Sequence, residues 1–193
     1  MPDGSTRDFE GWETLQTTPW YSMLRQDDWH AVTITGGLGA AALLVLDSLG
    51  QVLLLRVFRV PLDRVCLEIP RGFAKTGEAP ADCARREFTE ETGLALRSDQ
   101  MIHLGSVFPD SGILATPIEL FAARLDRPFP EHIPFDRKEV VGYQVVEAEE
   151  LLRMIADGRV SDAFTIAATL RLATRQAGSL QDLARALKSQ PSL

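Results

Sequence analysis

The chain has 193 residues, of which 45% are hydrophobic and 24% are charged, and its formal net charge at pH 7 is -7. This length and composition suit one globular domain with a sizeable core and exclude a disordered or fibrous chain. The net negative charge supplies no basic field to recruit nucleic acid or an anionic membrane, so neither is expected as a partner. A phosphate-containing ligand would depend on a metal ion and on local arginines.

The N-terminus and the cysteines give no sign of export or of a zinc site. The first 13 residues lack the basic and apolar regions of a secretory signal, and the longest apolar run, residues 38–46, is too short to span a bilayer. Cys66 and Cys83 have no zinc-ligand spacing and are expected to be reduced packing residues. These features predict a cytoplasmic enzyme.

Residues 1–36 are polar and rich in turn-forming residues, yet they contain all three tryptophans, Trp12, Trp20 and Trp29. Only residues 32–35 have the β-branched alternation of a strand. We expect residues 1–36 to form an N-terminal arm or small strand extension that packs on this domain or on a partner subunit. Residues 37–193 are expected to form the main domain.

Strands and then one helix are predicted from residue 40 onward. The apolar runs at 40–46 and 52–60 predict two strands that are buried on both faces, separated by a turn at 47–50. A short strand at 65–69 ends at Pro70. A helix is predicted over 80–92, because Pro80 is tolerated in a first turn and Gly93 suits a C-terminal cap.

The second half of the chain alternates strands with helices. Strands are predicted at 101–107, 118–123 and 139–146, with a proline-rich loop at 128–134. Helical spacing predicts helices over 147–156 and from 161 to about 174, and a capping box opens a last short helix at 179–182. This order predicts an α/β (α+β) fold in which helices pack against a mixed sheet.

The helix predicted at 80–92 carries three carboxylates on one side. Glu87, Glu90 and Glu91 have the spacing i, i+3, i+4 and share a face, whereas Phe88 lies toward the core. Converging like charges are unfavourable, and a hard divalent cation with oxygen ligands is one common way to relieve them. The alternative is a solvated surface helix with weak ion pairs.

The segment from Gly72 to Leu94 resembles the Nudix box. That pattern is G-x5-E-x7-R-E-U-x-E-E-x-G-U, where U is a bulky aliphatic or aromatic residue. Every fixed position is matched, by Gly72, Glu78, Arg86, Glu87, Phe88, Glu90, Glu91, Gly93 and Leu94. The chain therefore resembles the Nudix hydrolases, which cleave nucleoside diphosphates linked to another moiety. The resemblance implies an α/β/α sandwich.

The resemblance also implies a metal site on this segment. Glu87 and Glu91 are the implied metal ligands, followed by Glu90, and the main-chain carbonyl of Arg71 is a further implied ligand. Carboxylates together with substrate phosphates suit Mg²⁺, with Mn²⁺ as the alternative. The metal would screen the charge of the diphosphate and lower the pKa of a bound water.

Four residues are expected to support the chemistry. Arg86 would orient the glutamates through charge-assisted hydrogen bonds, and Glu78 would hold the loop and helix geometry or the water network. In the family the general base is often a glutamate outside the box or late within it, which points to Glu139 and keeps Glu90 as a candidate. Glu139 stands where related ADP-sugar pyrophosphatases carry a catalytic loop glutamate. An ordinary exposed glutamate is the alternative.

Segments on either side of the box resemble those of ADP-ribose pyrophosphatases. Residues 56–59 resemble a QYR segment, residues 67–72 an E-L-P-A-G segment, and residues 157–165 a "dGkI-da-T" segment. Pro109 lies where that subfamily typically places a proline, sixteen residues beyond Gly93. The substrate-binding residues implied by this resemblance are Arg56, Arg59, Glu68, Arg71 and Pro109.

The chain departs from these segments at two positions. Arg56 stands in place of the usual glutamine, and Arg71 in place of the alanine before the box glycine. An extra guanidinium near the phosphates would favour a more anionic substrate. The alternatives are that Arg59 is a strand-end surface arginine with Glu68 as its salt-bridge partner, and that Pro109 is an ordinary turn former.

The resemblance implies metal-dependent hydrolysis of ADP-ribose or a related nucleoside diphosphate sugar to a nucleoside monophosphate and a sugar phosphate. Dinucleoside polyphosphates, NADH and coenzyme A are the alternative substrates. A non-catalytic nucleotide-sugar sensor and an acidic surface helix on an unrelated α/β protein are the alternative functions. Because related enzymes exchange N-terminal strands, the resemblance also implies a homodimer.

Overall fold

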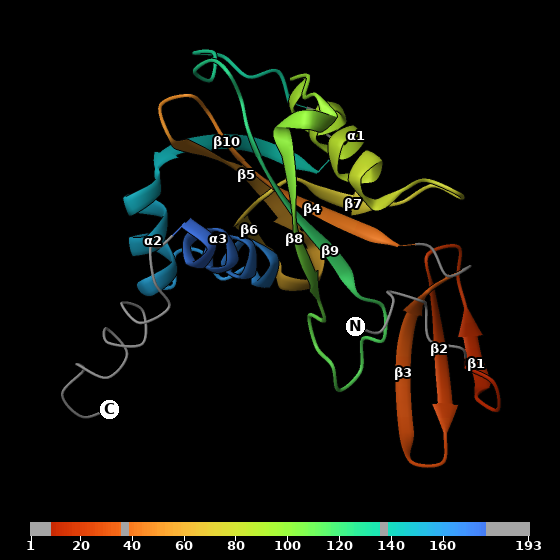
Figure 1. Ribbon diagram of the computed structural model, residues 1–193. Coiled ribbons are helices and arrows are strands. Elements are labelled where there is room, and N and C mark those ends of the chain that lie inside the picture. Colours follow the sequence, from red (N-terminus) through yellow and green to blue (C-terminus); the bar gives the residue numbers. More distant parts are fainter. Residues whose placement is uncertain (1–8, 36–38, 136–138, 177–193) are drawn as a thin grey trace.

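A mixed sheet enclosed by helices, with a smaller sheet beside it, makes up the computed structural model, which describes residues 9–35, 39–135 and 139–176 (Figure 1). The smaller sheet consists of β1 (Glu13–Thr17), β2 (Tyr21–Gln26) and β3 (Trp29–Ile34). The strands of the main sheet are β4 (Ala40–Leu46), β5 (Gln51–Arg59), β6 (Arg64–Glu68), β7 (Arg71–Phe73), β8 (Met101–Val107), β9 (Ile118–Arg124) and β10 (Val140–Glu147). The helices are α1 (Pro80–Thr92), α2 (Ala148–Ala156) and α3 (Ala163–Gln176), with short 3-10 turns at Val60–Leu62 and Ser98–Gln100.

The main sheet is built around β4 and β9, which pair in parallel, while its other strand pairs are antiparallel. Its order is β10-β5-β4-β9-β8, with β6 paired to β5 and β7 paired to β4. Strands β4 and β5 pair only where Leu46 meets Val52, close to their connecting turn. Beyond that point β7 pairs with the first residues of β4, so the short strand that begins the box lies beside the central strand.

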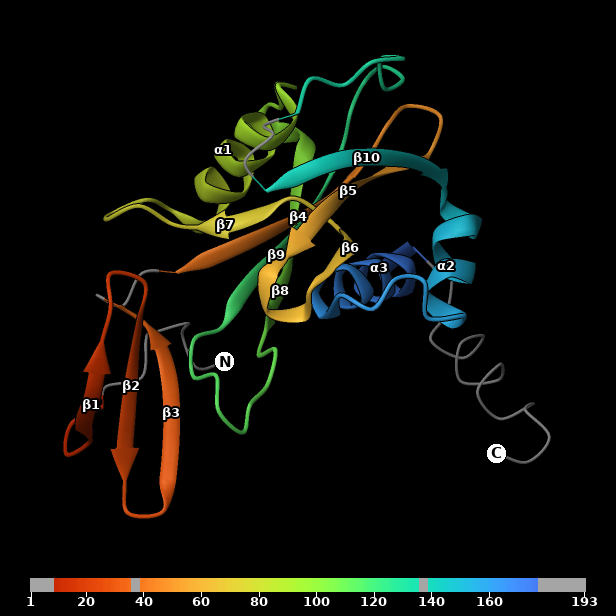
Figure 2. The same ribbon diagram turned by 180° about the vertical axis from the view of Figure 1, so that it is seen from behind.

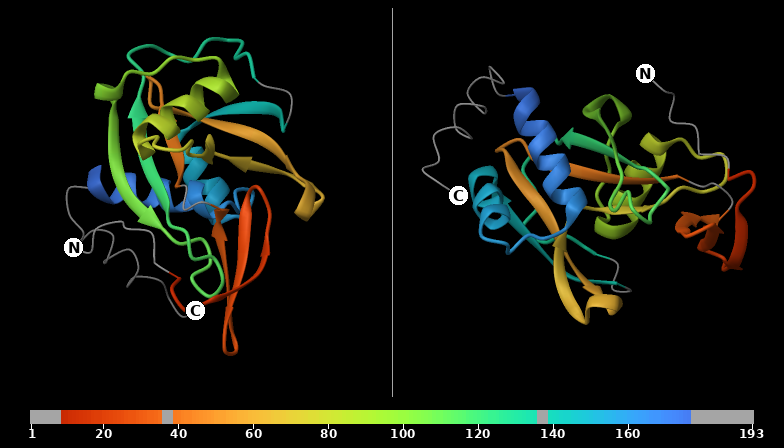
Figure 3. Two further views of the ribbon diagram at one scale, coloured as in Figure 1. Left: turned by 90° about the vertical axis from the view of Figure 1, so that its right-hand side faces the viewer. Right: turned by 90° about the horizontal axis from the view of Figure 1, so that it is seen from below.

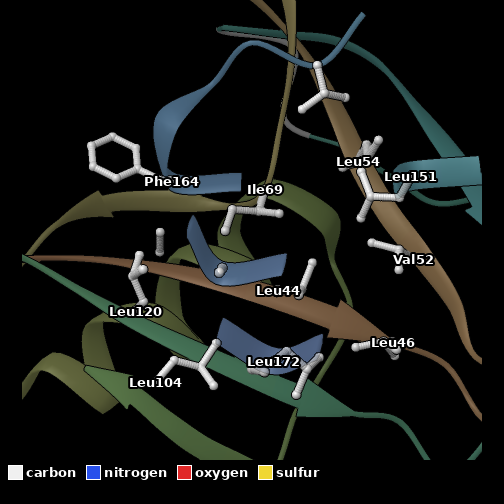
Figure 4. Packing of buried hydrophobic residues seen from close by; sticks show 14 of the residues in the cluster. Leu44, Leu46, Val52, Leu54, Ile69, Leu104, Leu120, Leu151, Phe164 and Leu172 are labelled. Carbon is white, nitrogen blue, oxygen red and sulfur yellow. The ribbon is translucent and has the colours of Figure 1, made fainter. Parts of the chain in front are cut away.

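Successive residues of β4 face opposite sides of the sheet, and both sides are covered. Helix α1 covers one side and helices α2 and α3 cover the other (Figure 1, Figure 2). Leu43 packs in the core with Phe88 of α1, whereas Leu44 packs in the core that includes Leu151 and Leu172 of α2 and α3 (Figure 4). This double burial explains the unbroken apolar run, and the predicted α/β/α sandwich is confirmed.

Most predicted elements of the main domain are confirmed. The elements β4, α1 and β8 begin and end at the predicted residues, and the other predicted strands and helices differ by one or two residues at their ends. The helix predicted after residue 179 lies outside the described residues. Burial on both faces is correct for β4 but wrong for the end of β5, where Arg56 and Phe58 are exposed. There β5 has left β4 and pairs only with β6 and β10.

The N-terminal sheet contains two strands, β1 and β2, that the sequence did not predict. Most of their side chains are exposed, so no alternating buried pattern was present to reveal them. Strand β3 attaches to the loop between β8 and β9: Val32 exchanges main-chain hydrogen bonds with Ile113 and Ala115, and the Thr33 and Thr116 hydroxyls lie 2.9 Å apart. The rest of the sheet extends away from the main sheet (Figure 3).

Within residues 9–35, 39–135 and 139–176, no helix is both long enough and apolar enough to cross a bilayer.

Candidate active site

Helix α1 presents its acidic side to β7 because local signals and core packing fix its ends and its rotation. Pro80 occupies the first turn, and Gly93 caps the C-terminus in the left-handed conformation, with φ of 66° and a hydrogen bond from its N–H to the Thr89 carbonyl. Cys83 and Phe88 are fully buried on the side that faces the sheet. The glutamates at 87 and 91 are thereby directed toward the Arg71–Phe73 strand.

Arg86 binds three of the box carboxylates at once. Its guanidinium donates to both oxygens of Glu78 at 2.8 and 2.9 Å, to Glu87 at 2.6 Å and to Glu90 at 2.9 Å. It also donates to the Phe73 carbonyl at 2.8 Å, which joins helix α1 to β7. The hydrogen bonds from Arg86 lower the pKa of Glu78 to about 2. One positive charge is therefore shared among three negative charges.

Gly72 leaves the space that the Glu87 carboxylate occupies. A β-carbon added to Gly72 would overlap that carboxylate, so no other residue type fits here without displacing Glu87. The glycine position of the box is therefore explained by a close approach and not by an unusual backbone angle. Strand β7 and the acidic side of α1 are in direct contact at this point.

Glu91 lies at the same corner, but its negative charge is compensated far less than that of Glu87. Its carboxylate accepts one hydrogen bond, 3.3 Å long, from the Arg71 N–H. Burial, followed by the negative charge of Glu87, raises the pKa of Glu91 to about 8, and burial also raises the pKa of Glu87. Two partly buried carboxylates with raised pKa values are suitable oxygen ligands for a hard divalent cation.

The main chain of Arg71 faces the same corner. Arg71 pairs with Ala42, while the flanking hydrogen bonds of the β4–β7 ladder are made by Pro70 with Leu43 and by Ala74 with Gly39. Hydrogen-bonded and non-hydrogen-bonded pairs alternate along an antiparallel ladder, so Arg71, directly after the bonded residue Pro70, directs its N–H and C=O away from β4. The Arg71 N–H uses this direction to reach Glu91.

The glutamates are not already gathered into a metal cage. In the part of the chain that the structure describes, no group of three or more His, Cys, Asp or Glu side chains is arranged to hold a metal ion. Arg86 draws Glu87 and Glu90 toward itself, and about half of the Glu90 side chain is exposed. The residues that could contribute to a cation site are therefore Glu87 and Glu91 first, with Glu90 at the rim.

A second ion-pair cluster surrounds Glu68, whose side chain is only 3% exposed. Arg59 binds both of its oxygens, with distances of 2.9 and 2.6 Å, and Arg71 binds Oε2 at 2.8 Å. Burial raises the pKa of Glu68, but the hydrogen bonds and charges of the two arginines outweigh it, and the net pKa is lowered. The Arg71 guanidinium also lies 4.5 Å from the ring centre of Phe164.

The predicted substrate-binding residues are only partly brought together. Arg59, Glu68 and Arg71 form one cluster, but Arg56 and Arg59 are three residues apart on β5 and therefore point to opposite faces of that strand. The side chain of Arg56 lies against Gly142 of β10. Pro109 lies in the loop that pairs with β3, away from this cluster.

Glu139 lies directly before β10 and is attached to the second cluster. Its carboxylate is 3.4 Å from Arg59, its main-chain carbonyl accepts a hydrogen bond from the Phe58 N–H, and its side chain is 72% exposed. This position is open to solvent, and a water molecule could reach the carboxylate. The contact with Arg59 was not predicted from the sequence.

Asp162 and Thr165 are positioning residues within the segment 157–165 that the resemblance pointed to, although no role was predicted for either. Asp162 Oδ2 accepts hydrogen bonds from the main chain and the hydroxyl of Thr165, at 2.9 and 2.7 Å, and so caps α3. The Thr165 hydroxyl in turn accepts the Ile69 N–H at 3.0 Å. These bonds join α3 to the turn between β6 and β7. The signal was a capping residue followed three positions later by a hydroxyl.

Comparison with known proteins identifies the same region. A model of the NUDIX domain matches residues 37–167. The chain is 30% identical to the ADP-ribose pyrophosphatase of Bacillus subtilis (strain 168), over 72% of this chain and 74% of that protein. It is 33% identical to the GDP-mannose pyrophosphatase of Yersinia enterocolitica, over 67% and 70%. It is 29% identical to the methanol dehydrogenase activator of Bacillus methanolicus, over 72% and 74%.

Proposed function

This chain belongs to the Nudix family of hydrolases, and from that premise we propose that its substrate is ADP-ribose or a related nucleoside diphosphate sugar. The products would be a nucleoside monophosphate and a sugar phosphate. The observation that carries the proposal is the pair of partly buried carboxylates, Glu87 and Glu91, beside Gly72 in a complete box. The pyrophosphatases among the relatives support a nucleoside diphosphate sugar.

Members of the family use divalent metal ions, and we propose Mg²⁺ for this chain, with Mn²⁺ as the alternative. Glu87 and Glu91 would hold the ion, together with the main-chain carbonyl of Arg71 and with Glu90 from the rim. When bound, the ion supplies charge screening for the diphosphate and acidifies a water molecule. Glu87 would have to turn from Arg86 toward the ion, and Arg86 would keep Glu78 in place.

The remaining steps fall to side chains of the chain. Hydrolysis joins a water oxygen to one phosphorus and breaks the bond from that phosphorus to the bridging oxygen. Glu139 would accept the proton of the attacking water as general base, since it is exposed, close to Arg59 and placed at the edge of the site. Arg59 and Arg71 would bind phosphate oxygens through their guanidinium groups.

The direct test is turnover of ADP-ribose as the Mg²⁺ concentration is increased. We expect no turnover without a divalent ion, and AMP and ribose 5-phosphate with it. GDP-mannose, NADH, coenzyme A and a dinucleoside polyphosphate in parallel assays would rank the alternative substrates. Binding of ADP-ribose without hydrolysis under any metal condition would favour the sensor function instead.

The general base is tested separately with Glu139→Gln. We expect kcat to fall by about 10²–10⁴-fold, the range typical of general acid–base catalysis, while KM changes little. Near-normal turnover would remove Glu139 from this role and leave Glu90 as the candidate. The matched control is Glu131→Gln, which changes another exposed glutamate in the segment between β9 and β10.

We also propose that two copies of the chain associate. Trp20 and Trp29 of the N-terminal sheet are 63% and 69% exposed, and Tyr21 and Met23 are also exposed. Large apolar side chains grouped on one small sheet favour an interface. A solution mass equal to one chain at micromolar concentration would contradict the homodimer.

A further inference from the structure

The segment between β9 and β10 is anchored at residues 131–135, where it passes the C-terminal end of α1 (Figure 1). Ile133 is fully buried in the core that also contains Phe88. Pro134 lies against Gly93, the last glycine of the box: a β-carbon added to that glycine would stand 2.8 Å from Pro134 Cγ. The left-handed backbone of Gly93 and this close approach both require glycine, and the contact attaches the segment to the end of the box helix.

Tyr143 of β10 holds the other side of this segment. Its hydroxyl donates to the Glu131 carbonyl at 3.1 Å and accepts the Ile133 N–H at 3.2 Å. Its ring meets that of Phe135 edge to face, with the ring centroids 6.0 Å apart. Because Ile133 is fully buried, its N–H would find no water in place of the hydroxyl, and a buried donor without a partner costs free energy. The hydroxyl therefore contributes two specific bonds that a phenylalanine could not make.

The anchored segment leads directly to Glu139. Four peptide steps separate Phe135 from Glu139, so their Cα atoms can lie no more than roughly 14 Å apart. On the other side, β10 begins at Val140, which is buried and pairs with β5, and the Glu139 carbonyl accepts the Phe58 N–H at 3.1 Å. The carboxylate itself is 72% exposed and lies 3.4 Å from Arg59. Its position is therefore set mainly by the main chain on either side of it.

We propose that Tyr143 is a positioning residue for Glu139. Its hydroxyl holds residues 131–135 against β10, and this anchor fixes the approach of the chain to Glu139, so that the carboxylate stays within hydrogen-bond reach of the attacking water. Tyr143 takes no part in the proton transfer, which runs from the water to the Glu139 carboxylate. The inference rests on the proposed role of Glu139 as general base.

The kinetic test is Tyr143→Phe, which keeps the ring and removes only the hydroxyl. We expect kcat for ADP-ribose to fall by about 10- to 10²-fold, since a misplacement of about 1 Å can cost about 10²-fold, while KM and the half-activating Mg²⁺ concentration stay constant. In a Glu139→Gln background the same substitution should lower kcat no further, because the group that it positions is already gone. The matched control is Thr174→Val, which removes a hydroxyl bonded to two main-chain carbonyls of α3 and should leave kcat unchanged.

Amide hydrogen exchange of the whole chain in EDTA tests the anchor without any turnover. In Tyr143→Phe we expect exchange to become about 2- to 10-fold faster at the Ile133 N–H, which loses its partner, and at the Phe58 N–H, which is bonded to the Glu139 carbonyl. The amide of Leu43, fully buried in β4, reports global opening, and its rate should change least. The control variant should change none of the three rates.

An unchanged exchange rate at the Phe58 N–H would overturn the positioning role, whatever the substrate proves to be. An equal fall in kcat with and without the Glu139 carboxylate would overturn it as well, because the Tyr143 hydroxyl would then act independently of Glu139. Near-normal turnover by Glu139→Gln would refute the proposed general base and, with it, the kinetic role of Tyr143. Absence of turnover by the wild type would refute the proposed substrate and leave hydrogen exchange as the deciding measurement.

Discussion

The two ion-pair clusters on either side of β7 differ in how far their charges are compensated. On the α1 side, one guanidinium, that of Arg86, is shared by three glutamates. On the α3 side, one carboxylate, that of Glu68, is shared by Arg59 and Arg71. The first cluster has surplus negative charge even before Glu91 is counted. In the second cluster, Glu139 and Asp162 also lie 3.4 Å from Arg59 and 3.7 Å from Arg71, respectively, so each arginine has a second carboxylate partner.

This difference in charge compensation distinguishes the two parts of the site. A structural ion-pair network reaches its lowest energy when its charges balance, whereas uncompensated charge in a partly buried place is typical of a binding site. The negative surplus on the α1 side suits a cation, whereas the two arginines on the α3 side are compensated by the carboxylates around them. The three-residue strand β7 (Arg71–Phe73) lies between the two clusters. The Arg71 side chain belongs to the α3-side cluster, and the Phe73 carbonyl belongs to the α1-side cluster.

The largest effect is expected from Glu91→Gln, which removes negative charge from the α1 side without changing the shape of the side chain. Loss of residues that merely support metal ligands costs about 10–100-fold, so loss of a ligand should lower kcat for ADP-ribose by more than about 10²-fold. The measurement is kcat over a Mg²⁺ titration. Glu149→Gln, at an exposed position in α2, is the control. Unchanged kcat and unchanged half-activating Mg²⁺ would exclude Glu91 from the metal site.

Glu68→Gln removes the central carboxylate of the α3 side and should cause the largest loss of stability. The carboxylate is almost fully buried, and its loss leaves two arginines without their main partner. Breaking a buried pair typically costs 3–5 kcal/mol, and we expect about 3 kcal/mol here because both arginines are partly exposed. Urea unfolding measures this. A loss below about 0.5 kcal/mol would contradict the cluster.

Arg86→Gln should destabilise the metal-free chain by a smaller amount, about 2 kcal/mol, because Glu90 is half exposed and can turn to water. Mg²⁺ should restore part of this loss by taking over the neutralisation of Glu87. The control Arg85→Gln breaks an exposed pair with Asp82 and should cost less than about 1 kcal/mol. Equal losses for the two variants would show that Arg86 is an ordinary surface arginine.

The sequence predicted the α1 side of this comparison well because its signals are local. Pro80 and Gly93 mark the ends of the helix, and the spacing of Glu87 and Glu91 places them on one face whatever the rest of the chain does. The approach of Glu87 to Gly72 follows from the box pattern only once β7 is known to pair with β4.

The α3 side could be predicted only in part, because its contacts are long-range. Arg71 and Asp162 are far apart in the chain, and no local pattern shows that their side chains come within 3.7 Å. The period of a strand could have separated Arg56 from Arg59, but the resemblance grouped them. Strands β1 and β2 escaped prediction because a sheet with exposed faces carries no buried pattern.

The smallest predicted effect concerns pH and distinguishes two carboxylates of the α1 side. The pKa of Glu91 is raised from 4.5 to about 8, so in the metal-free chain the folded state keeps a proton that the unfolded state loses. Stability from this group is therefore fully present below pH 4.5 and is lost as the pH rises to 8. Glu78 has the opposite sign: its pKa is lowered to about 2, so its contribution is present above pH 4.5 and is lost toward pH 2.

Thermal unfolding in EDTA from pH 5 to 8.5 tests this sign. After allowance for solvent screening, we expect the free energy of unfolding of the wild type to fall between pH 5 and 8.5 by about 1–2 kcal/mol more than that of Glu91→Gln. This corresponds to a difference of a few degrees in Tm. Saturating Mg²⁺ should abolish the difference by stabilising the ionised form. If both chains respond identically to pH without metal, Glu91 is already compensated by the protein, and the negative surplus on the α1 side does not include it.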